Sequence, residues 1–303
     1  MDPTQRTGII YILLSVTGYA FFPTFARLLQ ESGLPSLDIA TWRFAIAAPI
    51  FWLVVLARRS PPTGQRLPRY QLMGMGTLLA AAALCAFFGL ERIPVSTFIV
   101  LFYTYPAMVA LMSALLGERL PFQSWLALGL TLVGVALTAP DFSQGFSGDT
   151  SIGVILSLVN AFIVGVIVML SSRILRGHTE LARASSWTVT GACLVFLALA
   201  LLRPLGVPQR PAEWLGLLAM ASFSTVFPIF FLNAGIQKLG PTRASIMGTI
   251  EPVFTTILAI LFLGETIQPV QLFGGLLILA SLLLLQLRRS SPLSPPRFPP
   301  TDF

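Results

Sequence analysis

Two charged residues lie deep inside long apolar runs of this sequence, where burying a charge is costly. Glu251 stands midway along its run, directly before Pro252, and a carboxylate there can take up and release a proton. Arg43 lies roughly 10 to 12 Å into its run, and its guanidinium can bind a carboxylate. Each has a structural alternative: Glu251 hydrogen-bonds to backbone that Pro252 leaves unpaired, or Arg43 pairs with Asp38 or with backbone carbonyls.

Aromatic and amide side chains form a second group of candidate binding residues. Rings with a few hydroxyl and amide groups can line a cavity that suits zwitterions with apolar side chains. Tyr103 is the strongest single candidate, because it lies near the middle of its run and not at the end, where aromatic anchors gather. The competing interpretation is that membrane helices are rich in aromatic residues and that buried amides join two helices. The other candidates are Tyr11, Tyr19, Phe102, Tyr105, Asn160 and Asn233.

Ten apolar segments must position these residues. Each is about 20 residues long, the length that a helix needs to cross the hydrocarbon of a bilayer. The sequence therefore predicts an all-α membrane protein with ten transmembrane helices. The segments are 7 to 29, 36 to 57, 71 to 90, 94 to 116, 122 to 140, 151 to 172, 184 to 203, 214 to 236, 241 to 263 and 268 to 287.

The composition excludes a soluble domain. Hydrophobic residues make up 55% of the chain and charged residues only 10%, with a mean hydropathy of +0.83. The net charge of +7 comes from small groups of basic residues between the apolar runs, so we expect no face that binds nucleic acid. The sequence holds neither a Walker-type phosphate loop nor a Cys/His/carboxylate cluster, so we expect no cofactor and no metal.

An enzymatic function is not expected either. Residues 145–148, GFSG, match a pattern of intramembrane serine proteases, but they lie in a polar loop. The single histidine, His178, lies in a loop on the opposite side of the membrane. A serine without a base in reach is not an active nucleophile.

The distribution of Lys and Arg predicts the orientation. With the N-terminus in the cytoplasm, the inner loops and ends hold fourteen of the nineteen Lys and Arg residues, whereas the outer loops hold three. Both termini are therefore expected in the cytoplasm, with the protein in the inner membrane of a bacterial cell. The stretch from 288 to 303 is rich in proline and serine, and we expect it to be a disordered cytoplasmic tail.

A sequence block recurs at a fixed distance along the chain. Pro94 and the Gly-Glu pair at 117–118 return as Pro241 and the Gly-Glu pair at 264–265, each 147 positions later. Five predicted spans separate the copies, and this odd number inverts the second half relative to the first. Transporters are often built from two such halves.

Prolines interrupt several of the runs. Pro106 and Pro252 are 146 positions apart, one fewer than the repeat, so a constant spacing of 147 places Thr104 opposite Glu251. A slip of one residue turns a helix by about 100°, and the two halves need not present matching side chains. The candidate hinges or kinks are Pro23, Pro106, Pro228 and Pro252.

Three stretches resemble the drug/metabolite transporter superfamily, EamA type. They are AGIQKLGPTRA at 234–244, IEPVFTTILAILFLGET at 250–266 and the fainter copy YPAMVALMSALLGERL at 105–120. The resemblance covers the whole membrane region and implies ten spans in two related halves, which we place at 1–145 and 146–287. Within the superfamily, the chain is most similar to bacterial inner-membrane exporters of aromatic and other amino acids.

The expected function is therefore secondary transport. We expect export of small metabolites, above all aromatic or apolar amino acids, by alternating access through a central cavity, either coupled to protons or down the substrate gradient. The alternative is a multidrug-type exporter of aromatic cations, because Glu251 attracts positive charge. A non-transporting membrane scaffold is a further alternative, against which the duplicated halves argue. The expected partners are the substrate and the lipid bilayer, and a monomer holds a complete pathway.

Overall fold

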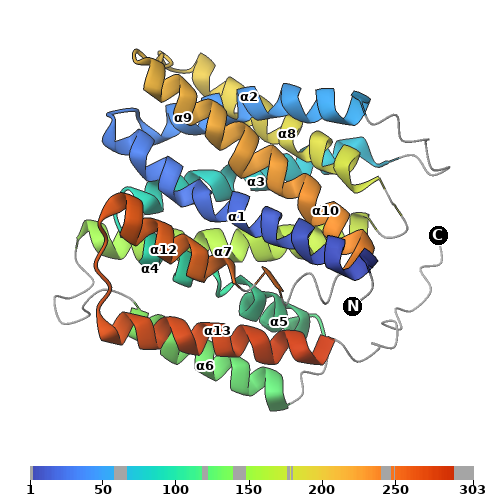
Figure 1. Ribbon diagram of the computed structural model, residues 1–303, viewed down its shortest axis with the longest axis vertical. Helices are drawn as coiled ribbons and strands as arrows, with labels where there is room; N and C mark the ends of the chain where they lie inside the picture. The colour runs from blue at the N-terminus through green and yellow to red at the C-terminus, as the bar shows by residue number, and fades with distance from the viewer. Residues whose placement is uncertain are drawn as a thin grey trace.

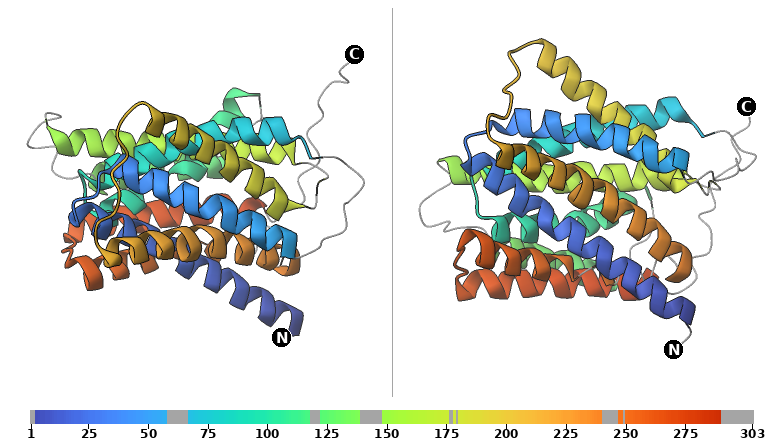
Figure 2. Two further views of the ribbon diagram at one scale, coloured as in Figure 1. Left: turned by 90° about the horizontal axis from the view of Figure 1, so that it is seen from above. Right: turned by 45° about the horizontal axis from the view of Figure 1, so that its top comes forward.

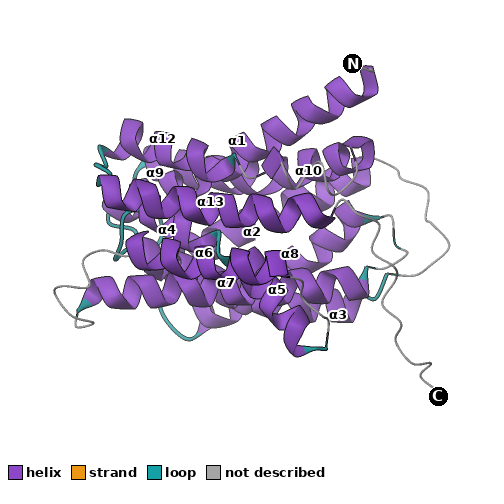
Figure 3. Ribbon diagram, turned by 90° about the horizontal axis from the view of Figure 1, so that it is seen from below, coloured by secondary structure: helices purple, strands orange, loops and turns teal. Residues whose placement is uncertain are grey.

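The computed structural model describes residues 3–57, 67–117, 122–138, 148–175, 178, 180–239, 247–248 and 250–289. Within these residues every regular element is a helix, as the sequence predicts (Figures 1 and 3). Glu118, Pro241, most of the GFSG motif and most of the predicted tail lie outside the described residues. The elements are α1 (Pro3–Glu31), α2 (Ser36–Ala57), α3 (Arg69–Leu90), α4 (Val95–Phe102), α5 (Tyr105–Leu115), α6 (Phe122–Thr138), α7 (Asp149–Ile174), α8 (Leu181–Leu201), α9 (Pro211–Ala221), the π-helix η2 (Ser222–Val226), α10 (Phe227–Leu239), α12 (Glu251–Leu263) and α13 (Pro269–Arg289).

The helices lie side by side in one bundle with two ends (Figures 1 and 2). α1 begins at the end where α13 finishes, which we call the terminal end. The opposite end, the loop end, holds the connections from α1 to α2 and from α8 to α9 (Figure 2). The interior is packed with large side chains; for example, the rings of Phe44 and Phe196 stack with centroids 5.1 Å apart, and both are buried.

Seven helical stretches among the described residues are long and apolar enough to cross a membrane. Two of them, Val95–Leu115 and Pro211–Ile236, contain an interruption. Three shorter apolar helices accompany them, Phe122–Leu137, Glu251–Leu263 and Pro269–Leu284. These lengths support a multi-pass membrane protein, and ten crossings remain a prediction.

Helix contacts recur between the two halves of the chain. α1 packs against α10 and α12, and α7, at the corresponding place in the second half, packs against α3, α4 and α5. α6 packs against α13, and α2 against α8. Asp149, the first residue of α7, pairs with Arg92 just after α3, whose last residue Leu90 accepts a hydrogen bond from Arg27 near the end of α1. Thus α7 begins where α1 ends, and the two run in opposite directions.

Glycines allow α3 and α8 to approach closely. A Cβ atom on Gly76 would collide with the backbone of Thr188 and Gly191, and one on Gly191 would collide with the backbone of Met73. Small residues at such contacts let membrane helices pack through their backbones.

The fourth apolar run, expected as one helix, is two helices with a turn between them. α4 ends at Phe102, Tyr103 and Thr104 form the turn, and α5 begins at Tyr105. Pro106 is the second residue of α5 and has no N–H to continue the hydrogen-bond ladder of α4. The proline therefore sets the position of the break.

In the second half, α12 begins in the same way as α5, one residue out of step with the repeat. α12 begins at Glu251 and has a proline as its second residue, just as α5 begins at Tyr105 and has a proline as its second residue. Tyr105 and Glu251 are therefore the equivalent positions of the two halves. The pairing of Thr104 with Glu251 that a constant spacing predicts is therefore wrong. α5 has 11 residues and α12 has 13, and both lead into a glycine with positive φ, Gly117 at 92° and Gly264 at 65°. The stretch from the proline to the glycine is one residue longer in the second half, so the one-residue offset of the repeat lies within α12.

A third interruption lies between α9 and α10. The π-helix η2 ends just before α10, whose second residue is Pro228. Because Pro228 cannot donate to the carbonyl of Ser224, the helical ladder is free to widen there. Pro23, by contrast, lies inside the continuous helix α1.

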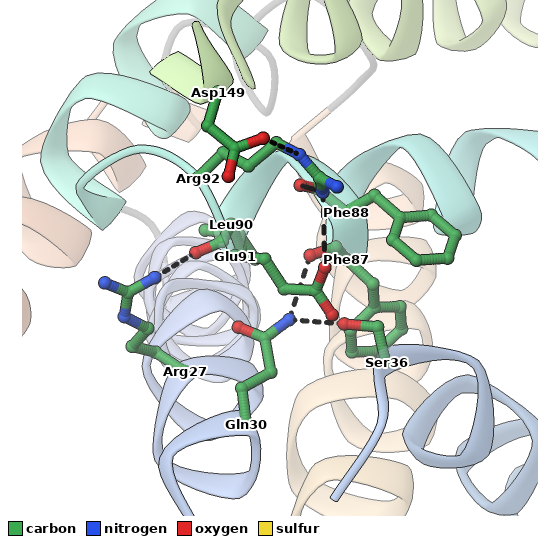
Figure 4. Close-up of polar contacts among 9 residues, drawn as sticks. All are labelled: Arg27, Gln30, Ser36, Phe87, Phe88, Leu90, Glu91, Arg92 and Asp149. Atoms are coloured by element: carbon green, nitrogen blue, oxygen red, sulfur yellow. Dashed lines mark hydrogen bonds and ion pairs between the residues drawn. The ribbon is translucent and has the colours of Figure 1, made fainter. Parts of the chain in front are cut away.

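Polar contacts tie the helices together at the loop end (Figure 4). The Gln30 Nε2 atom donates to the Ser36 hydroxyl at 2.8 Å and to the Phe87 carbonyl at 2.9 Å, which connects α1, α2 and α3. The second half contributes Glu265, whose carboxylate accepts from the Val95 N–H at 2.5 Å, the Ser96 N–H at 3.0 Å and the Ser96 hydroxyl at 2.6 Å. Glu265 therefore caps the N-terminus of α4, a helix of the first half.

Candidate functional site

The turn between α4 and α5 places Tyr103 in the interior. Its side chain is only 7% exposed, and its hydroxyl donates to the Gly248 carbonyl at 3.4 Å. The Glu251 side chain lies beside the same hydroxyl. The break in the first half and the helix start in the second half therefore meet at one point.

Glu251 is the first residue of α12 and is half-buried. A carboxylate in the first turn of a helix is stabilised by the N–H groups that have no partner there. Within the described part of the chain, no ion pair neutralises Glu251. Its position thus has a structural reason, and among the described residues no cation pairs with its carboxylate.

Arg43 points into the bundle. Its Nε atom donates to the Thr225 hydroxyl at 3.0 Å, and its guanidinium carbon lies 4.2 Å from the ring centroid of Phe22 and 5.3 Å from that of Phe44. These rings hold the planar group by cation–π contact. Among the described residues, Arg43 has no carboxylate partner.

The expected pairing of Arg43 with Asp38 is wrong. Asp38 is buried and forms an ion pair with Arg203, which follows α8. Five residues along a helix correspond to a turn of about 140° beyond one full revolution, so the two side chains of α2 leave on different faces.

Thr225 is a site residue that the sequence did not indicate. Its hydroxyl donates to the Met220 carbonyl at 2.9 Å, five residues earlier, and accepts from Arg43. Thr225 lies within the π-helix η2, and π-helices are frequently found at functional sites. Pro228 was a signal for an irregularity here, but nothing in the sequence joins Thr225 to Arg43.

Tyr19 of α1 is electrostatically coupled to both charged residues. It interacts electrostatically with Glu251, with Arg43 and with Tyr105. Tyr19, Arg43, Tyr105 and Glu251 are all half-buried, so each keeps surface that water can touch although it lies within the bundle. These four residues, from α1, α2, α5 and α12, form one polar cluster, which we call the central cluster.

Aromatic rings complete this central cluster. The Phe102 ring centroid lies 5.7 Å from that of Tyr103 and 5.5 Å from that of Tyr105, and the two tyrosine rings are 6.0 Å apart. Such distances are typical of stabilising ring pairs. Phe102 therefore joins the two tyrosines.

Three sequence candidates are not connected to the central cluster by any described contact. Tyr11 packs on Phe231 with ring centroids 5.5 Å apart, and it lies eight residues, about 12 Å, from Tyr19 along α1. Asn160 is buried in α7. Asn233, in α10, has a buried side-chain nitrogen without a hydrogen-bond partner among the described residues. The roles proposed for these three residues stay predictions.

Comparisons with known proteins agree with the fold and with the resemblance noted above. The EamA-like transporter family matches residues 6–139 and 151–287. An uncharacterized transporter of Synechocystis is 29% identical over 228 residues, covering 74% of this chain and 68% of that protein. The Pseudopaline exporter CntI of Pseudomonas aeruginosa is 26% identical over 278 residues, covering 90% and 95%. Protein RarD of Streptomyces exfoliatus is 26% identical over 294 residues, covering 93% and 88%.

A solved crystal structure supports the same architecture. It aligns with a TM-score of 0.63 at 19% identity and covers 95% of this chain and 99% of its own. This likeness concerns the fold alone. The two family matches, one in each half, show that this chain is a member of the EamA-like transporter family.

Proposed function

We propose that this protein is a secondary transporter that exports small amino acids with aromatic or apolar side chains. The observation that carries the proposal is the central cluster, where a glutamate, an arginine and three tyrosines from both halves of the chain gather. A zwitterion needs partners for two opposite charges, and its apolar side chain needs a ring-lined surface.

Alternating access fits the arrangement of the helices. In this proposal the ten spans form two inverted halves, both termini are cytoplasmic, and the loop end faces the outside of the inner membrane. The cap of Glu265 on α4 and the contacts of Figure 4 then close the outer side. The interruptions at Tyr103 and before Glu251 supply points where the helices bend.

Glu251 is the proposed site of proton coupling. It is the carboxylate of the central cluster, and the groups that face it are Tyr103 of the α4–α5 turn and Tyr19 of α1. Uptake of a proton from one side and its release to the other would link substrate export to the proton gradient.

Export of aromatic cations is the second candidate, because Glu251 and the rings suit a positive charge. Arg43 argues against it: its guanidinium interacts with the same Tyr19 as Glu251 does and repels a cation. In a site that binds only cations, the positive charge of Arg43 would weaken their binding.

The test is transport by purified protein in liposomes with and without an imposed proton gradient. We expect flux of radiolabelled phenylalanine or leucine that exceeds the flux of tetraphenylphosphonium. Absence of amino-acid flux under both conditions would refute the proposal, and flux of the cation alone would establish the second candidate.

A further inference from the structure

The two half-buried charges of the central cluster, Arg43 and Glu251, form no described ion pair with each other. Arg43 and Glu251 both act on Tyr19, yet no ion pair joins them in the described part of the chain. A buried charge without a counter-charge is costly, and proteins keep such groups where a ligand completes the pair.

The remaining hydrogen-bonding capacity of Arg43 indicates what completes it. The contact with Thr225 uses the Nε atom, whereas the two terminal nitrogens have no hydrogen bond among the described residues. Phe22 and Phe44 lie against the guanidinium and offer no acceptor. A guanidinium held in this way presents a planar fork to a carboxylate.

Glu251 offers the opposite chemistry. Its carboxylate lies beside the Tyr103 hydroxyl, and an ionised carboxylate has about four acceptor positions. An ammonium group carries three donors and fits this capacity.

We propose that Arg43 and Glu251 are the two poles of one zwitterion site, where Arg43 binds the carboxylate and Glu251 binds the ammonium group of a single amino acid, with Thr225 as a positioning residue for Arg43. The inference rests on the proposed function and assigns the orientation of its substrate. Tyr19 interacts with both poles, so in this proposal the substrate backbone lies beside α1 and its side chain meets the rings of Phe102 and Tyr105.

Three probes of the same shape separate the poles. Phenylalanine carries both charges, phenethylamine lacks the carboxylate, and 3-phenylpropionate lacks the ammonium group. Binding is measured on purified protein in lipid nanodiscs, because neutral forms of the two analogues leak through bilayers. We expect wild-type protein to prefer phenylalanine about tenfold or more over either analogue, since each lost charged hydrogen bond costs that much in affinity.

The variants are expected to lose one preference each. Arg43→Gln removes the preference over phenethylamine and leaves the preference over 3-phenylpropionate, and Glu251→Gln does the reverse. The controls Arg69→Gln and Glu31→Gln change exposed residues of the same types and should alter neither ratio. If a glutamine variant fails to fold, Arg43→Lys and Glu251→Asp keep the charge and should show the same loss in part.

Thr225 is tested by a change that a purely structural role would not produce. Thr225→Val should weaken phenylalanine binding and leave phenethylamine binding unchanged, and Thr225→Ser should restore the wild-type ratio. The two-pole assignment is overturned if Arg43→Gln or Glu251→Gln lowers the affinity for all three probes by the same factor. If wild-type protein binds none of the probes, the proposed function itself fails.

Discussion

The α4–α5 turn and the start of α12 are one backbone device used twice with different side chains. Each begins a helix with a proline at its second position and leads to a glycine with positive φ. The first copy delivers the hydroxyls of Tyr103 and Tyr105, and the second delivers the carboxylate of Glu251. Duplication thus builds a symmetric frame, and substitution at equivalent positions makes the chemistry asymmetric.

The second helices of the two halves show the same contrast. Arg43 of α2 points into the central cluster, whereas Thr190, 147 positions later in α8, donates to the Ser186 carbonyl at 2.8 Å and accepts from the Trp52 indole at 3.0 Å. At equivalent positions of the repeat, one half has a charged side chain and the other has a hydroxyl whose hydrogen bonds are satisfied. The candidate binding groups are therefore distributed unequally between the halves.

The largest effect is expected from removing the charge of Glu251 at the start of α12. Glu251→Gln should abolish the stimulation of phenylalanine flux by a proton gradient, because the amide cannot carry a proton between the two sides. Flux driven by the substrate gradient alone should fall about tenfold through weaker binding. Liposome flux with and without the gradient measures both, and Glu31→Gln is the matched control. Poor expression of the variant would favour a structural role for Glu251.

The pH dependence of binding sharpens the same contrast. A proton and the substrate ammonium compete for one carboxylate, so phenylalanine affinity should fall as the pH is lowered and Glu251 becomes protonated. The α4–α5 turn contributes only tyrosine hydroxyls to the proposed site, so Tyr105→Phe should leave the pH dependence of phenylalanine affinity unchanged. Titration of phenylalanine binding from pH 5 to pH 8 checks the prediction. A wild-type affinity that rises at low pH would contradict it.

A smaller effect is expected from the first copy. Tyr103→Phe removes the hydroxyl that donates to the Gly248 carbonyl and lies beside Glu251, and it keeps the ring. One such hydrogen bond contributes about 0.5 to 1.5 kcal/mol, so phenylalanine affinity should fall roughly 2- to 13-fold. Tyr70→Phe, at an exposed tyrosine, is the control. An unchanged affinity would remove Tyr103 from the site.

The smallest effect concerns the cap that joins the two halves. Glu265→Ala removes three hydrogen bonds to the start of α4 and should lower the free energy of unfolding by about 1 to 2 kcal/mol. Ser96→Ala keeps the two backbone bonds and should cost about half as much or less. Thermal unfolding in detergent measures both. Equal losses for the two variants would show that the backbone bonds contribute nothing.

The sequence predicted much of the frame, because length and hydropathy alone define a membrane helix. The run from 36 to 57 matches α2, and the run from 71 to 90 lies within α3. It also singled out Arg43, Glu251, Tyr103 and Tyr19, since a polar residue in an apolar run is visible without a structure.

Pairings across the bundle were beyond reach. Asp38 pairs with Arg203, 165 positions away, and Glu265 caps a helix 169 positions earlier. The role of Thr225 depends on a local widening of the helix that a hydroxyl in an apolar run does not signal. Which residues meet is decided by helix packing between the halves, and no local pattern carries that information.

Labelling of single cysteines tests whether the α4–α5 turn and the start of α12 form one binding site. In a background with Cys85 and Cys193 replaced by alanine, Tyr105→Cys reports on the first interruption and Gly248→Cys on the second, where an added side chain meets open space. We predict that a water-soluble thiol reagent labels both positions and that phenylalanine slows both reactions at the same concentration. Protection of one position only, or of neither, would contradict the account.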